Sequence, residues 1–333
     1  MARGQFLRPA AVLKARWEQQ PENPALNYQL SRAWSALGDL DGALRLAEKA
    51  LAADPDSAQY HVQVAAVTGH QAEKASLFKQ LGLARRTKKE LDAAYALDPR
   101  NEDALYGLLL FDYAAPSMLG GDKVKALQFA DALTSINPAR GYAAQAQLAN
   151  QRKDAVAEEA LLLKAIGVRP DYGDPEVYNA GMALAALYQA THRTADAEQT
   201  ACAALRADPA RIDAWRLLAE IAVTDQAWNE LEHLLQKATV QVPDDRSAHY
   251  AAATAMLRAG RRRHRAEALL RQYLRQPAEA GAPSLASARW QLAGLLEQTG
   301  RVDEAVAELE RAVADEPSLQ AARRDLQRLK KPS

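Results

Sequence analysis

Nine prolines recur along this chain at nearly regular intervals, and each follows a run rich in Ala and Leu. The gaps between them are 34, 44, 39, 32, 39, 34, 34 and 40 residues. A period of about 34 residues is typical of helix-turn-helix repeats, whose units bury their apolar faces only against neighbouring units. Because proline cannot continue a helix, each one marks the end of a unit. The prolines are Pro21, Pro55, Pro99, Pro138, Pro170, Pro209, Pro243, Pro277 and Pro317.

Apolar and small residues recur at helical spacing inside each unit. Asn27, Leu30 and Trp34 share one face of a first helix, and Gly38 ends that helix. A second helix, lined by Ala, follows up to Pro55. The pattern predicts an all-α solenoid of about eight helix pairs with a capping helix at each end.

The units resemble the tetratricopeptide repeat family, whose pattern is Trp-x2-Leu-Gly-x2-Tyr followed by Ala, Phe and Pro. The opening of the pattern is present at Trp215 and Leu218, and its middle at Leu184, Ala185 and Tyr188. The resemblance covers nearly the whole chain. It implies a right-handed superhelix that acts as a non-enzymatic scaffold or adaptor and binds a peptide or protein in its inner groove.

We expect three segments along the chain. Residues 1–23 form an N-terminal capping helix or half-repeat, residues 24–317 the solenoid, and residues 318–333 a C-terminal capping helix and tail. Two units contain additional residues, near 70–83 and 114–122. With these insertions, the chain resembles an uncharacterised bacterial subgroup of the family.

The two insertions are the places where a function beyond scaffolding is expected, because insertions in repeat arrays form loops that often lie on a binding face. In the first insertion, Gly69 and Gly82 are predicted to break the helices, with an additional turn or an extended second helix between them. One alternative function is therefore a regulatory subunit that responds to a small ligand bound at the insertions.

A set of residues on the first helices forms the predicted partner-binding groove. Aromatic rings with a polar group offer a large contact area together with a hydrogen bond, which suits peptide recognition. The other interpretation of these aromatic residues is that they pack between neighbouring units. The groove set is Tyr28, Arg32, Tyr106, Leu110, Gln145, Arg216, Glu220, Tyr250 and Trp290.

A short basic run gives a second candidate site, for a phosphate group or an acidic partner. The other interpretation is a solvated turn whose charge is balanced by nearby carboxylates. Lys plus Arg equals Asp plus Glu at 42 each, so general nucleic-acid binding is not expected, and polyanion binding is kept only as an alternative function. The patch consists of Arg261, Arg262, Arg263 and Arg265.

No catalytic, cofactor or metal motif is present in the sequence. The six histidines form no HExxH-like pair, and Cys202 is the only cysteine, so neither a metal site nor a disulfide is expected. The Gly120-Gly121-Asp122-Lys123 run lacks the spacing of a phosphate loop and is predicted to be a turn in which Asp122 caps a helix. We expect no enzymatic activity and no cofactor.

The compartment and the oligomeric state are weakly specified. No apolar stretch reaches the length of a membrane span and residues 1–8 lack the apolar centre of a secretory signal, so a cytoplasmic protein is the default expectation. An exported, periplasmic protein is the alternative if a signal peptide had been removed. Val12, Leu13 and Ala15 would otherwise form an exposed apolar side of the N-terminal helix, which predicts either self-association through that helix or a missing upstream repeat.

Overall fold

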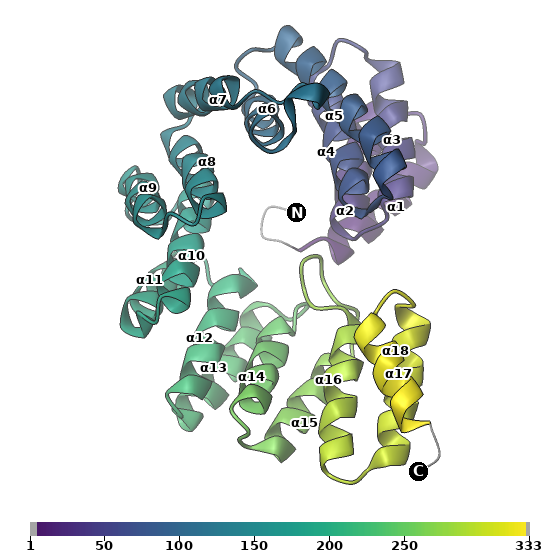
Figure 1. The fold of residues 1–333 in the computed structure, drawn as a ribbon, viewed down its shortest axis with the longest axis vertical. Helices are drawn as coiled ribbons and strands as arrows, with labels where there is room; N and C mark the ends of the chain where they lie inside the picture. Colours follow the sequence, from purple (N-terminus) through teal and green to yellow (C-terminus); the bar gives the residue numbers. More distant parts are fainter. Residues whose placement is uncertain (1–4, 331–333) are drawn as a thin grey trace. The chain divides into compact units, whose positions relative to one another are not determined.

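The computed structural model describes residues 5–330, and in that range all regular secondary structure is helical (Figure 1). Eight helix pairs follow one another between helices α1 (Leu7–Gln19) and α18 (Gln320–Leu329). The first helices are α2 (Pro24–Ala36), α4 (Ala58–Lys74), α6 (Glu102–Ala114), α8 (Pro138–Gln151), α10 (Pro175–Ala190), α12 (Ile212–Thr224), α14 (Ser247–Arg258) and α16 (Leu285–Gln298). The second helices are α3 (Leu40–Ala53), α5 (Leu77–Leu97), α7 (Lys123–Ile136), α9 (Ala155–Gly167), α11 (Thr194–Ala207), α13 (Trp228–Gln241), α15 (Arg263–Tyr273) and α17 (Val302–Asp315). This confirms the all-α repeat fold and the number of pairs.

The recurring prolines lie in the turns between pairs, with one exception. Pro138 is the first residue of α8, a position where its missing N–H is not needed for the helix. The single residue Asn137 ends α7 and begins α8, and its side chain accepts the N–H of Arg140 over 3.2 Å. Because Pro138 lies at the start of the helix and not in the turn before it, the interval from Pro138 to Pro170 is short.

In six of the eight repeats, a left-handed residue lies two positions after the last residue of the first helix. This conformation closes the end of a first helix, and glycine adopts it without the steric cost that other residues incur. Three of the repeats place another residue there, which explains why a glycine alone does not mark every turn. The left-handed residues are Gly38, Lys153, His192, Gln226, Gly260 and Gly300.

The helices form two compact units, which divide between Leu187 and Tyr188 within α10. In the first unit, buried clusters join α1 to α3 and α4 to α8. The second unit contains a continuous cluster from α12 to α18, in which small residues such as Ala252 and Ala293 are fully enclosed where helices cross. Close packing of alanines allows the short distances between helices that a stacked repeat needs.

The first insertion lengthens a helix pair rather than forming a loop. Helix α4 has 17 residues and α5 has 21, and they meet at Ala75 and Ser76. The prediction of breaks at Gly69 and Gly82 is wrong, because both glycines lie inside these helices. An isolated glycine costs a helix only about 1 kcal/mol, which tertiary contacts of the same helices readily offset.

The second insertion forms a short 3-10 helix, η1 (Ser117–Leu119), between α6 and α7. Gly120 takes a left-handed conformation, and a side chain on Gly121 would collide with the carbonyl oxygen of Ala115. Asp122 accepts the N–H groups of Val124 and Lys125 at the start of α7. The segment is a tight capped turn, as the residues predicted.

The N-terminal helix is partly covered by its neighbour. Leu13 of α1 is buried against α2, and the Trp17 indole N–H donates to the buried Asn27 side chain over 2.8 Å. The expectation that Leu13 lies on an exposed apolar side is therefore wrong. Val12 and Ala15 do face solvent.

Candidate binding surfaces

A pocket of about 580 Å³ lies on the first-helix face of the second unit. Three of the predicted groove residues, from three successive repeats, line it: Glu220, Tyr250 and Trp290. Side chains from α12, α14 and α16 thus converge with one from the closing helix α18. The remaining lining residues are Thr254, Leu257, Arg258, Gln291, Gly294, Leu295, Gln298 and Asp325.

The two aromatic side chains of this pocket are held in place by neighbouring groups. The Trp290 indole N–H donates to Asp325 over 2.8 Å, and Asp325 also accepts from Arg328. The Tyr250 ring packs at 5.4 Å from the ring of Tyr273, tilted by 52°. Burial raises the pKa of the Tyr250 phenol, which therefore stays protonated and able to donate. Both rings offer fixed apolar faces, with little conformational freedom left to lose on binding.

The charged groups that line this pocket are the carboxylates of Glu220 and Asp325 and the guanidinium of Arg258. Glu220 lies 3.7 Å from Arg258, a pair that is partly exposed and weak. Arg216, which the sequence placed in the same groove, is half-buried on α12 and does not line the pocket. Asp325 does line it, and the repeat pattern contains no signal for its role because it comes from the capping helix.

A second pocket, of about 430 Å³, lies in the first unit among α6, α8, α9 and α10. Tyr106 is the only predicted groove residue in its lining. Its hydroxyl donates to Gln147 over 2.6 Å, and the guanidinium of Arg140 lies 5.5 Å from the ring centre. Burial raises the pKa of Tyr106, so it acts here as a neutral donor. Arg140 also binds Glu102, which orients it over the ring.

Polar residues of α8 and α10 supply most of the other functional groups of this pocket. Gln145 donates to Thr134 of α7 and points away, whereas Gln147, two residues further along the helix, lines the pocket. Leu110 packs against the core of the unit. A helical face at i, i+3, i+7 and i+10 was the available sequence signal for the pocket residues. That face of α8 comprises Arg140, Ala143, Gln147 and Asn150.

Tyr28 and Arg32 lie outside both pockets. The Tyr28 ring packs 5.4 Å from the ring of Tyr60, in the next first helix, and Arg32 lies 5.7 Å from the Tyr28 ring centre. Burial raises the pKa of Tyr28. Four aromatic residues were predicted to contact a partner in the groove. Of these, Tyr28 instead packs its ring between neighbouring repeats.

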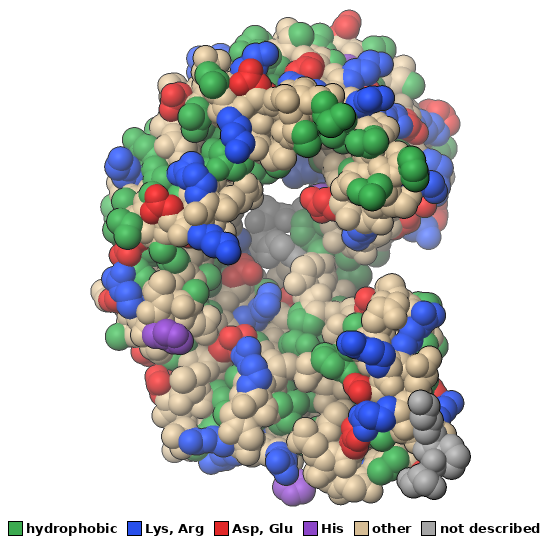
Figure 2. Space-filling model, in the orientation of Figure 1, with side chains coloured by type: hydrophobic (Ala, Val, Ile, Leu, Met, Phe, Trp, Pro, Cys, Tyr) green, Lys and Arg blue, Asp and Glu red, His purple; other side chains and the backbone are tan. Residues whose placement is uncertain are grey.

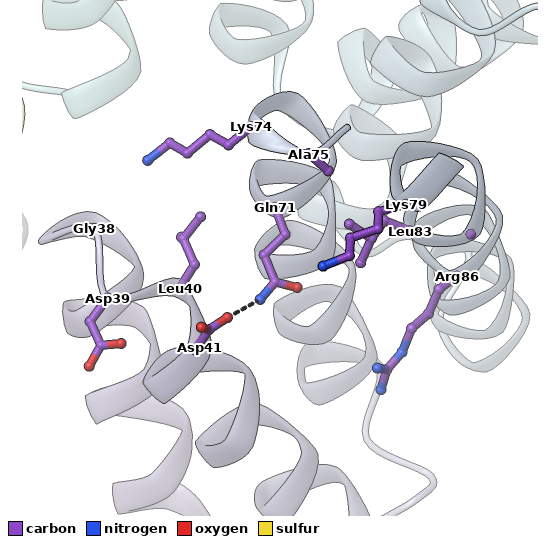
Figure 3. Close-up of a pocket in the computed structure, with 11 residues that line it drawn as sticks. Gly38, Asp39, Leu40, Asp41, Gln71, Lys74, Ala75, Lys79, Leu83 and Arg86 are labelled. Atoms are coloured by element: carbon purple, nitrogen blue, oxygen red, sulfur yellow. Dashed lines mark hydrogen bonds between the residues drawn. The ribbon is translucent and has the colours of Figure 1, made fainter. Parts of the chain in front are cut away.

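A third hollow, of about 740 Å³, is formed by the first insertion and is called the elbow groove (Figure 3). One wall comes from the turn before α3 and the other from the junction of α4 with α5. Gln71 donates to Asp41 across it over 2.9 Å, and Arg86 turns away to Glu48. The lining residues are Gly38, Asp39, Leu40, Asp41, Gln71, Lys74, Ala75, Lys79, Gly82, Leu83 and Arg86.

The four arginines of the predicted basic patch differ in their surroundings. Arg262 stacks 4.4 Å from the Trp228 ring centre, and Arg265 forms two hydrogen bonds with Glu232. Arg261 and Arg263 are exposed and make no ion pair with any described residue. Basic and acidic side chains are interspersed on the face that Figure 2 shows.

No group of three or more His, Cys, Asp or Glu side chains among residues 5–330 is placed to hold a metal ion. Within the same range, none of the helices combines the length and the apolar character needed to cross a membrane.

Comparison with known proteins relates the chain to repeat proteins. Residues 1–66 match the family model of the tetratricopeptide repeat. Among curated proteins no sequence matches closely enough to count as a relative. Yeast Tom70 is a similar solved structure, with a TM-score of 0.55 and 14% identity over 96% of this chain and 84% of that chain.

Two further solved structures resemble this chain. A monomeric mutant of IFIT1 with m7Gppp-AAAA matches with a TM-score of 0.53 and 15% identity, over 96% of this chain and 67% of that chain. A tetratricopeptide repeat protein from Parabacteroides merdae matches with a TM-score of 0.49 and 15% identity, over 79% and 98% of the two chains. At such low identity the likeness concerns the fold.

Proposed function

We propose that this tetratricopeptide repeat protein is a non-enzymatic scaffold or adaptor that binds a peptide or protein segment on the face of its first helices. The observation that carries the proposal is the pocket of the second unit. There, Tyr250 and Trp290 come from successive repeats and present fixed rings beside the polar groups of Glu220 and Asp325. Interface energy concentrates in such aromatic residues when they are well packed and shielded from water.

The pocket of the first unit supports the same mode of binding. Its amide-bearing side chains, Gln147, Asn150 and Asn179, supply donors and acceptors, while Leu162 and small residues supply apolar surface. Amide groups are suited to the N–H and C=O groups of a peptide backbone. A partner that contacts both rings and amides would lose conformational freedom, whereas the protein surface is already ordered.

Removing the two rings is expected to abolish most binding at the second unit. The double variant Tyr250→Ala, Trp290→Ala should weaken partner binding at least about tenfold, because each buried aromatic anchor contributes more than about 1 kcal/mol. Partners captured from a lysate by the unmodified protein would be identified, and their affinities for each variant measured by titration calorimetry. Val240→Ala, an exposed change on a second helix, is the control.

The single variant Trp290→Phe sharpens this test. It keeps an aromatic ring but removes the N–H that donates to Asp325. An intermediate loss is expected, because the ring then adopts more than one orientation. Equal affinities of all variants and the unmodified protein would refute the pocket of the second unit as the binding site.

Polyanion binding through the basic patch is the second candidate. Arg261 and Arg263 are exposed without an ion pair among the described residues, and Arg258 and Arg261 line a shallow hollow beside Val223 and Thr224. An affinity that falls steeply with salt and is lost in Arg261→Ala, Arg263→Ala would support it, because phosphate contacts release counterions. Filter binding of single-stranded RNA at two salt concentrations is the measurement.

A further inference from the structure

The first insertion exposes large apolar side chains at the junction of α4 with α5. Phe78 is 92% exposed, Leu77 78% and Leu81 44%. All three lie within about one helical turn at the start of α5, and none belongs to a buried cluster of the first unit. Single exposed apolar residues are ordinary, but three together at one point indicate a contact surface.

The same junction has a strong excess of positive charge. Residues 74–89 contain six Lys and Arg and no Asp or Glu, in a chain whose net charge is zero. Two of the six are neutralised, Arg86 by Glu48 and Lys88 by Asp92 and Asp112. Lys74, Lys79, Arg85 and Lys89 make no ion pair with any residue in 5–330.

The elbow groove joins these charges to the apolar side chains. Lys74 and Lys79 belong to its wall, and Figure 3 shows their ammonium groups extending into the hollow. Leu77 and Phe78 lie between these lysines in the chain, so the groove and the apolar surface meet at the elbow. The opposite wall holds two carboxylates, and both are hydrogen-bonded: Asp39 accepts the N–H of Gly42, and Asp41 accepts from Gln71. Among the described residues, Lys74 and Lys79 are therefore the charged groups of the groove that make neither a hydrogen bond nor an ion pair.

We propose that the elbow is a second docking site, separate from the first-helix pockets, for an acidic segment of a partner protein. Carboxylates of the segment pair with Lys74 and Lys79 in the groove, and its apolar side chains cover Leu77, Phe78 and Leu81. Complementary charge steers such a segment to the site, and the apolar contact holds it. A lipid surface fits less well, because Lys74 and Lys79 line a groove, which a narrow peptide segment can enter and a bilayer surface cannot.

The test uses a fluorescein-labelled amphipathic peptide of Glu, Asp, Leu and Phe, and the full chain. A control peptide carries Gln and Asn in place of the acidic residues. Fluorescence anisotropy should show binding of the acidic peptide. The double variant Lys74→Glu, Lys79→Glu and the single variant Phe78→Ser should each reduce the affinity about tenfold or more. The double variant Lys237→Glu, Arg275→Glu makes the same charge change at exposed positions of the second unit and should bind normally.

Three results would overturn the proposal. They are no binding of the acidic peptide to the unmodified protein, equal binding of both peptides, and equal binding by the elbow variants and the control variant. Co-sedimentation with phosphatidylserine vesicles that is lost in Phe78→Ser would assign the surface to a membrane instead. Because Tyr250 and Trp290 are intact in the elbow variants, failure here leaves the test of the first-helix face unaffected.

Discussion

Acidification from pH 7 to pH 4 is expected to destabilise the fold by about 3 kcal/mol through His249 alone. This residue of α14 is 3% exposed, and its Nδ1 atom has no hydrogen-bond partner. Its Nε2 atom lies 3.4 Å from the Thr239 hydroxyl. Burial, reinforced by the charges of Arg246 and Arg265 against a smaller opposite effect of Glu232, lowers the pKa of His249 from 6.5 to about 4.

The direction of the pH dependence follows from which state binds the proton. Below pH 6.5 the unfolded chain protonates His249, while the folded protein keeps it neutral until the pH approaches 4. Proton binding therefore stabilises the unfolded state over this window, and the free energy of unfolding decreases progressively as the pH falls. One pKa unit corresponds to about 1.4 kcal/mol, which gives the expected loss.

Urea unfolding of the second unit, followed by the fluorescence of its Trp residues at pH 7, 5 and 4, measures this loss. His249→Gln keeps a polar group near Thr239 but cannot titrate. The difference in unfolding free energy between the two proteins should change by about 3 kcal/mol over the range. A constant difference at all three pH values would contradict the prediction.

Removal of the Lys88 ammonium is expected to destabilise the first unit by about 3 kcal/mol or more. Asp112 is fully buried on α6, and Lys88 on α5 lies 3.4 Å from its carboxylate. Burial raises the pKa of Asp112, and the charge of Lys88 opposes that effect. In Lys88→Met, the carboxylate would remain buried with no opposite charge in contact. The neighbouring variant Lys89→Met removes an exposed lysine without an ion pair and should be close to neutral.

A double-mutant cycle separates the pair from the rest of the packing. Asp112→Asn should cost little, because it removes the buried charge, and it should recover much of the stability that Lys88→Met loses. The cost of Lys88→Met should also shrink at low pH, where Asp112 becomes protonated in the folded state. Thermal unfolding of the four proteins at two pH values tests both points. Equal destabilisation by Lys88→Met and Lys89→Met would refute the assignment.

Helix positions and turns were predictable because short-range interactions determine them. Asn23 and Asp39 accept backbone N–H groups at helix starts, and Gly38 closes a helix in the left-handed conformation. Each of these interactions joins residues a few positions apart, so the sequence itself contains both partners. The mistaken breaks at Gly69 and Gly82 show the limit of this local reasoning, since contacts between the two long helices override a weak local preference.

The face of a helix to which a side chain belongs was harder to predict. Gln145 and Gln147 are two residues apart, which turns them by about 200° around the helix axis. The first contacts Thr134 and the second lines a pocket. A small error in helical phase thus exchanges a packing residue for a surface residue. Tyr28 and Tyr250 occupy equivalent positions in their repeats, and only their neighbours in the structure show that the first packs against Tyr60 and the second lines a pocket.

The sequence by itself determined the repeat period, the number of helix pairs and the ends of most helices, because these depend on proline, glycine and capping residues that act on adjacent backbone. The tertiary structure alone decided the contacts of Lys88 with Asp112, Trp290 with Asp325 and the elbow of α4 and α5 with the turn before α3. These pairs come from different helices and depend on how far one helix is rotated and shifted against the next. Packing of whole side-chain surfaces sets that geometry, and no local pattern encodes it.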